Sequence, residues 1–142
     1  MKKVNIIYWS GTGNTEAMAS LISEGAKEDG AEVKLLNVSE ASNNDITEAD
    51  IVILGSPAMG DEVVEESEMQ PFIDSAAETF KGKKVALFGS YGWGSGKWME
   101  DWTEKMHDDY GAEVLNDGLI VNGAPEGDSE EECKEFGKKL LG

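Results

Sequence analysis

A loop rich in hydroxyls and glycines, placed between an apolar run and a helical pattern, has the composition of an anion-binding site. The apolar run 4–8 is typical of a strand, and residues 16–22 have the spacing of a helix. Backbone N–H groups and the helix dipole at such a junction bind phosphate without a basic side chain. The loop itself consists of Ser10, Gly11, Thr12, Gly13, Asn14 and Thr15. The alternative is an ordinary strand–turn–helix junction in which Ser and Thr cap the helix.

Two common phosphate-binding motifs do not match this loop. The P-loop requires a lysine directly after its last glycine, and no lysine follows Gly13. The dinucleotide fingerprint requires a third glycine at the position that Glu16 occupies in this chain. The loop therefore favours a single phosphate, as on a mononucleotide.

Composition restricts the classes of protein and partner. The 142 residues suit one domain, 1–142, and carry 29 acidic against 12 basic side chains, a formal net charge of −17. This charge repels nucleic acid and anionic membranes and attracts basic partners, although it also suits a merely soluble surface. Because no apolar run approaches the roughly 20 residues of a membrane helix, and no cleavage site follows the first residues, we expect a soluble cytoplasmic protein.

Few residues in the chain suggest metal or thiol chemistry. The single cysteine, Cys133, excludes an internal disulfide and a multi-cysteine metal site, and its acidic surroundings favour the thiol over the thiolate. His107 has no ligand partner in its segment and receives no function. We therefore predict no metal site.

Short β-branched runs alternate with longer amphipathic ones along the whole chain, as in a doubly wound α/β domain. We predict strands at 3–8, 32–37, 51–55, 84–89 and 113–115 with 118–121, and helices at 14–28, 69–79, 96–110 and 129–141. A short or irregular helix is expected near 46–49. In such a sheet, right-handed crossovers place the loops 10–15, 56–62 and 90–96 at one edge, where ligands bind.

These three loops carry a resemblance to the short-chain flavodoxins of anaerobic bacteria. The matching segments are YWSGTGNTE at 8–16, AMGDE at 58–62 and KKVALFGSYGWG at 83–94, and the resemblance continues through EFGKK at 135–139. It implies a three-layer domain with a five-stranded parallel sheet in the order 2-1-3-4-5. It also implies non-covalently bound FMN and a low-potential one-electron carrier that cycles mainly between semiquinone and hydroquinone.

The resemblance assigns a part of the cofactor to each loop. It implies that 10–15 hold the phosphate, that Met59 packs on the inner face of the flavin, that Glu62 accepts from N3–H and that Trp93 stacks on the outer face. Ser90 and the backbone of 90–94 would line the ribityl and dimethylbenzene side. The implied cofactor-binding set beyond the phosphate loop is Pro57, Ala58, Met59, Gly60, Asp61, Glu62, Ser90, Tyr91, Gly92, Trp93 and Gly94.

Redox tuning is expected at Gly60 and Asp61. The resemblance implies that the peptide between them flips, so that the Gly60 carbonyl accepts a hydrogen bond from the protonated flavin N5. Glycine tolerates both signs of φ, and aspartate enters the left-handed region more readily than most residues, so both suit the flip. Carboxylates close by in the sequence, at Asp61, Glu62, Glu65 and Glu66, would then lower the second reduction potential.

Several of these residues have a structural alternative. Met59 could fill the core, and the acidic run at 62, 65, 66 and 68 could be a solvated face. Trp9 could lie near the phosphate or pack on a helix. Trp98 and Trp102 share one helical face and are expected in the core.

Two other functions compete with electron transfer. One is an FMN-dependent NAD(P)H reductase, although the chain offers no second dinucleotide site. The other is a phospho-receiver, although a receiver needs acidic residues where this chain has Tyr8, Trp9 and Ser10. We expect a monomer whose partners are redox proteins with basic docking patches, such as reductases, dehydrogenases and ferredoxin-linked enzymes.

Overall fold

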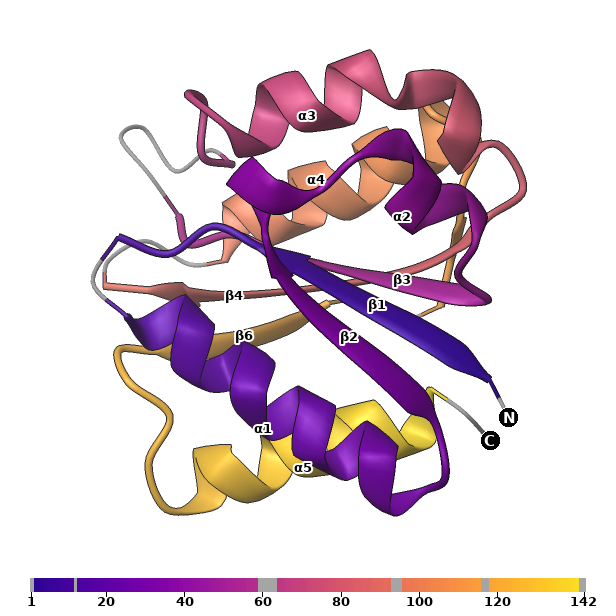
Figure 1. Ribbon diagram of the computed structural model, residues 1–142. Coiled ribbons are helices and arrows are strands. Elements are labelled where there is room, and N and C mark those ends of the chain that lie inside the picture. Colours follow the sequence, from indigo (N-terminus) through magenta and orange to yellow (C-terminus); the bar gives the residue numbers. More distant parts are fainter. Residues whose placement is uncertain (1, 12, 59–63, 93–95, 116–117, 141–142) are drawn as a thin grey trace.

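The computed structural model describes residues 2–11, 13–58, 64–92, 96–115 and 118–140. Its strands form a parallel sheet in the order β2-β1-β3-β4-β5 (Figure 1). β5 pairs with the first residues of β4, and β6 pairs with the last four residues of β4. The strands are β1 Lys3–Tyr8, β2 Glu32–Asn37, β3 Ile51–Gly55, β4 Lys84–Tyr91, β5 Glu113–Val114 and β6 Leu119–Asn122. The predicted strand order and the divided fifth strand are confirmed.

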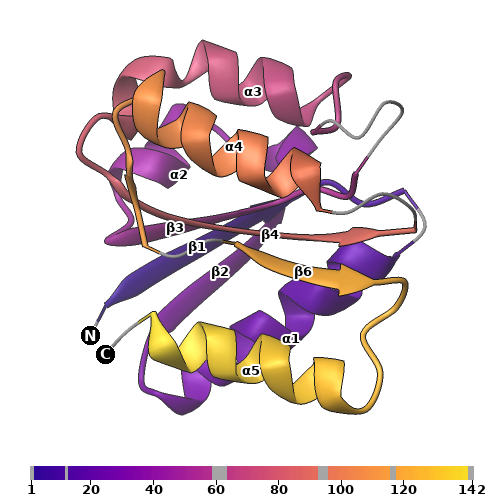
Figure 2. The ribbon, with the colours of Figure 1, turned by 180° about the vertical axis from the view of Figure 1, so that it is seen from behind.

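Helices cover both faces of this sheet. α1 (Asn14–Glu28) and α5 (Asp128–Lys139) lie on one face, and α2 (Asn43–Thr47), α3 (Met69–Ser75) and α4 (Lys97–Asp108) lie on the other (Figures 1 and 2). One buried cluster joins α1 and α5 to the sheet, and a second joins it to the remaining helices. The three-layer doubly wound architecture is therefore confirmed.

Continuous apolar runs form the centre of the sheet. All five residues of β3 are buried, and β4 is buried from Val85 to Ser90. Central strands of a parallel sheet are covered on both faces, so alternation with polar residues is lost there. These two strands hold their carboxyl ends rigidly at the edge where the loops lie.

Several boundaries differ from the predicted ones because tertiary contacts decide them. β4 continues to Tyr91 rather than Gly89, since its last four residues pair with β6. The predicted helix 69–79 ends at Ser75 and gives way to a 3₁₀ turn, Ala77–Phe80, and the short helix α2 begins at Asn43. The ends of α4, α5 and β6 differ from prediction by one or two residues.

Three notable side chains are buried in the core, and for the two tryptophans this confirms the prediction. Trp98 and Trp102 are fully buried in the core beneath α4. Cys133 is buried between α5 and the sheet, and this burial raises the pKa of its thiol to about 11. Its thiol therefore stays protonated at neutral pH.

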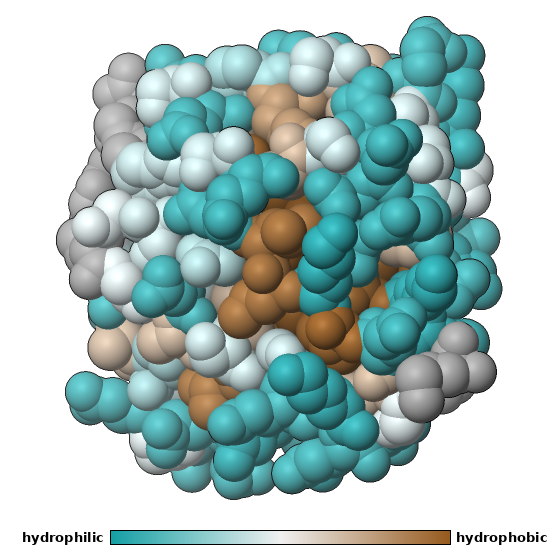
Figure 3. Space-filling view, viewed as in Figure 1, coloured by the Kyte–Doolittle hydropathy of each residue, from teal (hydrophilic) through white to brown (hydrophobic). Residues whose placement is uncertain are grey.

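Apolar side chains reach the surface along the edge strand β2 (Figure 3). Leu35 of this strand is 39% exposed. Lys34 of the same strand forms an ion pair of 2.9 Å with Asp45 of α2. No helix among the described residues is long and apolar enough to cross a membrane.

Candidate functional site

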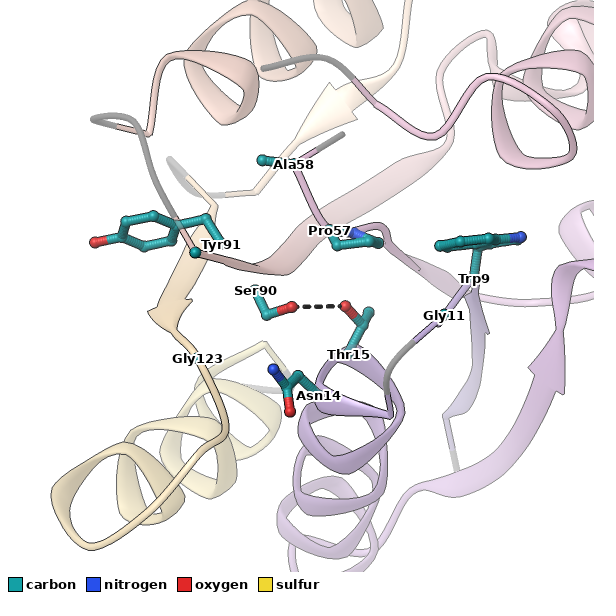
Figure 4. Close-up of a pocket in the computed structure, with 10 residues that line it drawn as sticks. Trp9, Gly11, Asn14, Thr15, Pro57, Ala58, Ser90, Tyr91 and Gly123 are labelled. Carbon is teal, nitrogen blue, oxygen red and sulfur yellow. Dashed lines mark hydrogen bonds between the residues drawn. The ribbon is translucent and has the colours of Figure 1, made fainter. Parts of the chain in front are cut away.

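A hollow of about 280 Å³ lies at the carboxyl ends of β1, β3 and β4, beside the first turn of α1 (Figure 4). Ligands bind at this edge in open parallel sheets, where neighbouring strands leave a crevice. Side chains and backbone from four segments of the chain line it, namely Trp9, Gly11, Asn14, Thr15, Pro57, Ala58, Ser90, Tyr91, Gly92 and Gly123. The described residues of the three loops expected at this edge do meet there.

One end of the hollow is suited to an anion. α1 begins directly after Gly13, which has a φ of 98°, and its first turn includes N–H groups that have no partner within the helix. The Ser10 hydroxyl accepts hydrogen bonds from the backbone N–H of Gly13 at 3.1 Å and of Glu16 at 3.3 Å. Ser10 therefore organises the loop, as the structural alternative expected, and its own hydroxyl hydrogen can still be donated.

A buried pair of hydroxyls forms the floor of the hollow. Thr15 Oγ1 lies 3.0 Å from Ser90 Oγ, and this hydrogen bond links α1 to β4 (Figure 4). Both residues are buried, with 1% and 4% of their surface exposed. Either hydroxyl can donate, so when Ser90 donates, the Thr15 hydrogen is available to a ligand.

Apolar side chains form the opposite part of the wall. Trp9 and Tyr91 lie at two ends of the hollow, with Pro57 between them (Figure 4). A Cβ on Gly11 would lie 2.9 Å from the far edge of the Trp9 indole, so any larger residue at this position would displace the ring. Trp9 lines the hollow and also packs against the buried core, so it has a place in both of the alternatives given for it.

None of the ten lining residues carries a charge. Around the hollow, Tyr8 donates a hydrogen bond to Glu16, and burial together with that carboxylate raises the pKa of Tyr8. A neutral wall with donors at one end and flat apolar groups at the other fits a planar ring joined to a phosphate. The described lining residues therefore fit a flavin mononucleotide.

Glu65 is buried, unlike the solvated acidic face that the structural alternative expected for residues 62, 65, 66 and 68. It is only 3% exposed, and its carboxylate accepts hydrogen bonds from the N–H groups of Ser67, Glu68 and Met69 and from the Ser67 hydroxyl. Burial alone would raise the pKa of Glu65, but the hydrogen bonds from Ser67, Met69 and Glu68 outweigh it and lower the pKa. Glu66 and Glu68 are exposed.

The structure brings together most of the predicted residues that it describes. Ser10 and Gly13 lie in the loop beside the hollow, and eight other predicted residues line it. Sequence reasoning did not assign Gly123, although its position directly after β6 places it at the same edge, where its N–H bonds to Tyr91 O at 2.9 Å. Predicted residues outside the described part of the chain are Thr12, Met59, Gly60, Asp61, Glu62, Trp93 and Gly94.

A doubly wound parallel sheet with a hollow at this edge is the arrangement expected of a flavodoxin-like protein. The family model described as flavodoxin matches residues 6–137. A flavodoxin of Clostridium beijerinckii is 53% identical over 96% of this chain and 98% of its own length. The chain belongs to the flavodoxin family; FMN is its cofactor, and it is an electron carrier.

Solved structures agree with this assignment. The solution structure of two-electron reduced Megasphaera elsdenii flavodoxin has a TM-score of 0.86 and 48% identity, covering 95% of this chain and 96% of that one. Oxidised flavodoxin 1 of Bacillus cereus has a TM-score of 0.84 and 28% identity, covering 98% and 97% of the two chains. Both likenesses extend over nearly the whole of each chain.

Proposed function

We propose that this chain is a low-potential electron carrier that works mainly between the one-electron-reduced and two-electron-reduced states of FMN. We also propose that residues 1–142 form one FMN-binding domain that acts as a cytoplasmic monomer. The hollow at the carboxyl ends of β1, β3 and β4, whose described lining residues carry no charge, is the observation that carries this proposal. Bound FMN supplies the redox chemistry, and the chain holds it and sets its potentials.

The phosphate is assigned to residues 10–15. The start of α1 provides backbone N–H groups and the positive end of a helix dipole, and both favour a dianion without a basic side chain. The Ser10 and Thr15 hydroxyls add donors, and Ser90 orients the Thr15 hydroxyl through their 3.0 Å contact. A site without Lys or Arg keeps the negative charge of the phosphate uncompensated close to the flavin.

The flavin ring is assigned to the apolar part of the hollow. Pro57, Ala58 and Met59 would lie on its inner side, and Trp93 would stack on its outer face. The backbone of 90–94 would line the ribityl and dimethylbenzene side, and Glu62 would accept from N3–H. Trp9 and Gly123 join this set because they line the same hollow. The backbone of Ala58 is fixed by a 3.0 Å hydrogen bond to Ser90 O, so the inner segment begins from a rigid position.

Two features of residues 60–66 set the potentials. The Gly60–Asp61 peptide would turn its carbonyl toward N5 when that atom is protonated, adding a hydrogen bond worth about 1 kcal/mol net and raising the first potential. Carboxylates close by in the sequence oppose the second electron, because it adds negative charge to the ring. Their effect lowers the second potential and makes the fully reduced protein a strong donor.

The acidic surface favours basic redox partners, such as reductases, dehydrogenases and ferredoxin-linked enzymes. Opposite charges speed the encounter of transient partners, and salt screens this effect. We expect the rate of electron transfer to a basic partner to fall as salt is added. A rate that is independent of salt would contradict charge-guided docking.

An FMN-dependent NAD(P)H reductase is the competing function, and one experiment separates the two. The FMN-bound protein is mixed anaerobically with NADH or NADPH alone, and then with a low-potential reductant and a redox mediator. A carrier stays oxidised with the nucleotides and is reduced by the mediated reductant. Rapid bleaching by a nucleotide alone would favour the reductase.

A further inference from the structure

Ser56 directly follows β3, and Glu65 lies on the other side of residues 59–63. A hydrogen bond joins Ser56 to Glu65. The Glu65 N–H donates to the Ser56 hydroxyl at 3.0 Å, and the same hydroxyl donates to Pro57 O at 3.0 Å. Ser56 is in turn fixed to β4, since its own N–H donates to Phe88 O at 3.1 Å. The described residues on either side of 59–63 are therefore held together at one anchored point.

The Glu65 carboxylate holds the second half of this anchor. One oxygen accepts from the N–H of Glu68 at 2.7 Å and of Met69 at 2.9 Å, and the other accepts from the Ser67 N–H at 2.8 Å. A buried carboxylate with this many donors is retained only in one orientation, because a lost bond leaves a charge unpaired away from water. These hydrogen bonds thus fix the chain that follows Glu65, up to the start of α3.

The same contacts reach the wall of the cofactor hollow. Glu65 binds the backbone of Glu68, and the Glu68 carboxylate accepts from Trp9 Nε1 at 3.2 Å. The Trp9 indole lines the hollow and lies against Gly11 of the phosphate loop. Glu65 thereby has two links: its N–H binds Ser56 at the end of β3, and its carboxylate reaches the Trp9 indole through the exposed residue Glu68.

We propose that Glu65 is a positioning residue for FMN, which fixes the return point of segment 59–63 and, through Glu68, the indole of Trp9. This inference rests on the proposed function, since it takes the roles of Gly60 and Asp61 from it. It also changes the expected part of Glu65 in redox tuning. Its main effect is on geometry, because donors around the carboxylate already offset its charge.

The two roles predict opposite signs for one substitution. If the Glu65 carboxylate acts only by its charge, neutralising it should raise both reduction potentials, because added negative charge on the flavin is then less disfavoured. An anchor lowers the first potential when it is weakened, because the flipped peptide is held less well near N5. We expect Glu65→Gln to destabilise the one-electron-reduced state about tenfold relative to the oxidised one, a fall of about 59 mV in the first potential.

Glu66→Gln is the matched control, since Glu66 is the neighbouring residue and its side chain is exposed. The substitution removes the same charge without touching the buried hydrogen bonds. It should leave the first potential unchanged or raise it. Ser56→Ala removes the hydroxyl that Glu65 N–H binds and changes no charge, so it should lower the first potential as Glu65→Gln does. It also keeps the test decisive if Glu65→Gln does not fold.

A second readout does not depend on FMN. In the cofactor-free protein, amide hydrogen exchange of Glu68 and Met69 should be faster in Glu65→Gln than in the parent or in Glu66→Gln. Equal exchange, together with a first potential that moves as in Glu66→Gln, would overturn the positioning role. Failure of the parent protein to bind FMN would instead overturn the proposed function, so the two failures are distinguishable.

Discussion

The hydroxyl of Thr15 offers the sharpest test of the phosphate site. Thr15→Val keeps the shape of a side chain that is 1% exposed and removes only the oxygen that lies 3.0 Å from Ser90 Oγ. We expect this substitution to weaken FMN binding, because the phosphate loses a hydroxyl donor. Binding of riboflavin, which lacks the phosphate, should hardly change.

The magnitude follows from the charge of the ligand. A hydrogen bond to a charged group contributes about 1.5–3 kcal/mol. At about 1.4 kcal/mol for each tenfold change, the FMN dissociation constant should rise about 10- to 150-fold. In the free protein the Ser90 hydroxyl loses its partner, which should lower the free energy of unfolding by about 1–3 kcal/mol.

Quenching of flavin fluorescence by the cofactor-free protein measures both dissociation constants. Thr103→Val on α4 is the control, since the hydroxyl of Thr103 donates to Glu100 O at 2.8 Å and Thr103 does not line the hollow. It should change neither affinity. An equal loss for FMN and riboflavin in Thr15→Val would refute the phosphate contact and leave Thr15 a purely structural role.

Three further predictions concern charge, pH and packing. Asp61→Asn should raise the second potential by up to about 70 mV if the carboxylate lies ~10 Å from the ring at an effective ε of about 20; an unchanged value in potentiometry would exclude this charge effect. Burial and the hydrogen bond to Asp74 raise the pKa of Tyr110 from 10.0 to about 12, so the free energy of unfolding should decline as pH rises through that range. Urea denaturation should show this decline flattened in Tyr110→Phe, and an identical slope would argue against it. A Cβ at Gly137 would lie 2.3 Å from Ile22 O, so Gly137→Ala should destabilise the fold by about 1–3 kcal/mol. An unchanged urea midpoint would show that α1 and α5 can move apart without loss of stability.

Local patterns predicted the elements whose boundaries depend on local signals. The bounds of β1, β2, β3 and α1 match the predicted ranges, because apolar runs and helical spacing mark them in the sequence itself. The extension of β4 to Tyr91 could not be predicted in this way, since it depends on pairing with β6, which lies about 30 residues later in the sequence.

The candidate site shows the same division. The glycine- and hydroxyl-rich loop identified itself through residue types, but the pairing of Thr15 with Ser90 joins positions that only the fold brings together. Glu65 was indistinguishable from its acidic neighbours in the sequence. Its burial follows from the Ser56 hydroxyl and the start of α3, neither of which leaves a signal in the acidic run itself.

Anaerobic reduction of the purified, FMN-bound protein in small steps, followed by visible absorption, tests the central claim most directly. The proposed carrier should accumulate a stable one-electron-reduced flavin with long-wavelength absorption before the second electron bleaches it at a much lower potential. Direct two-electron bleaching would contradict the one-electron role, and a protein that takes up no FMN would contradict the proposed site.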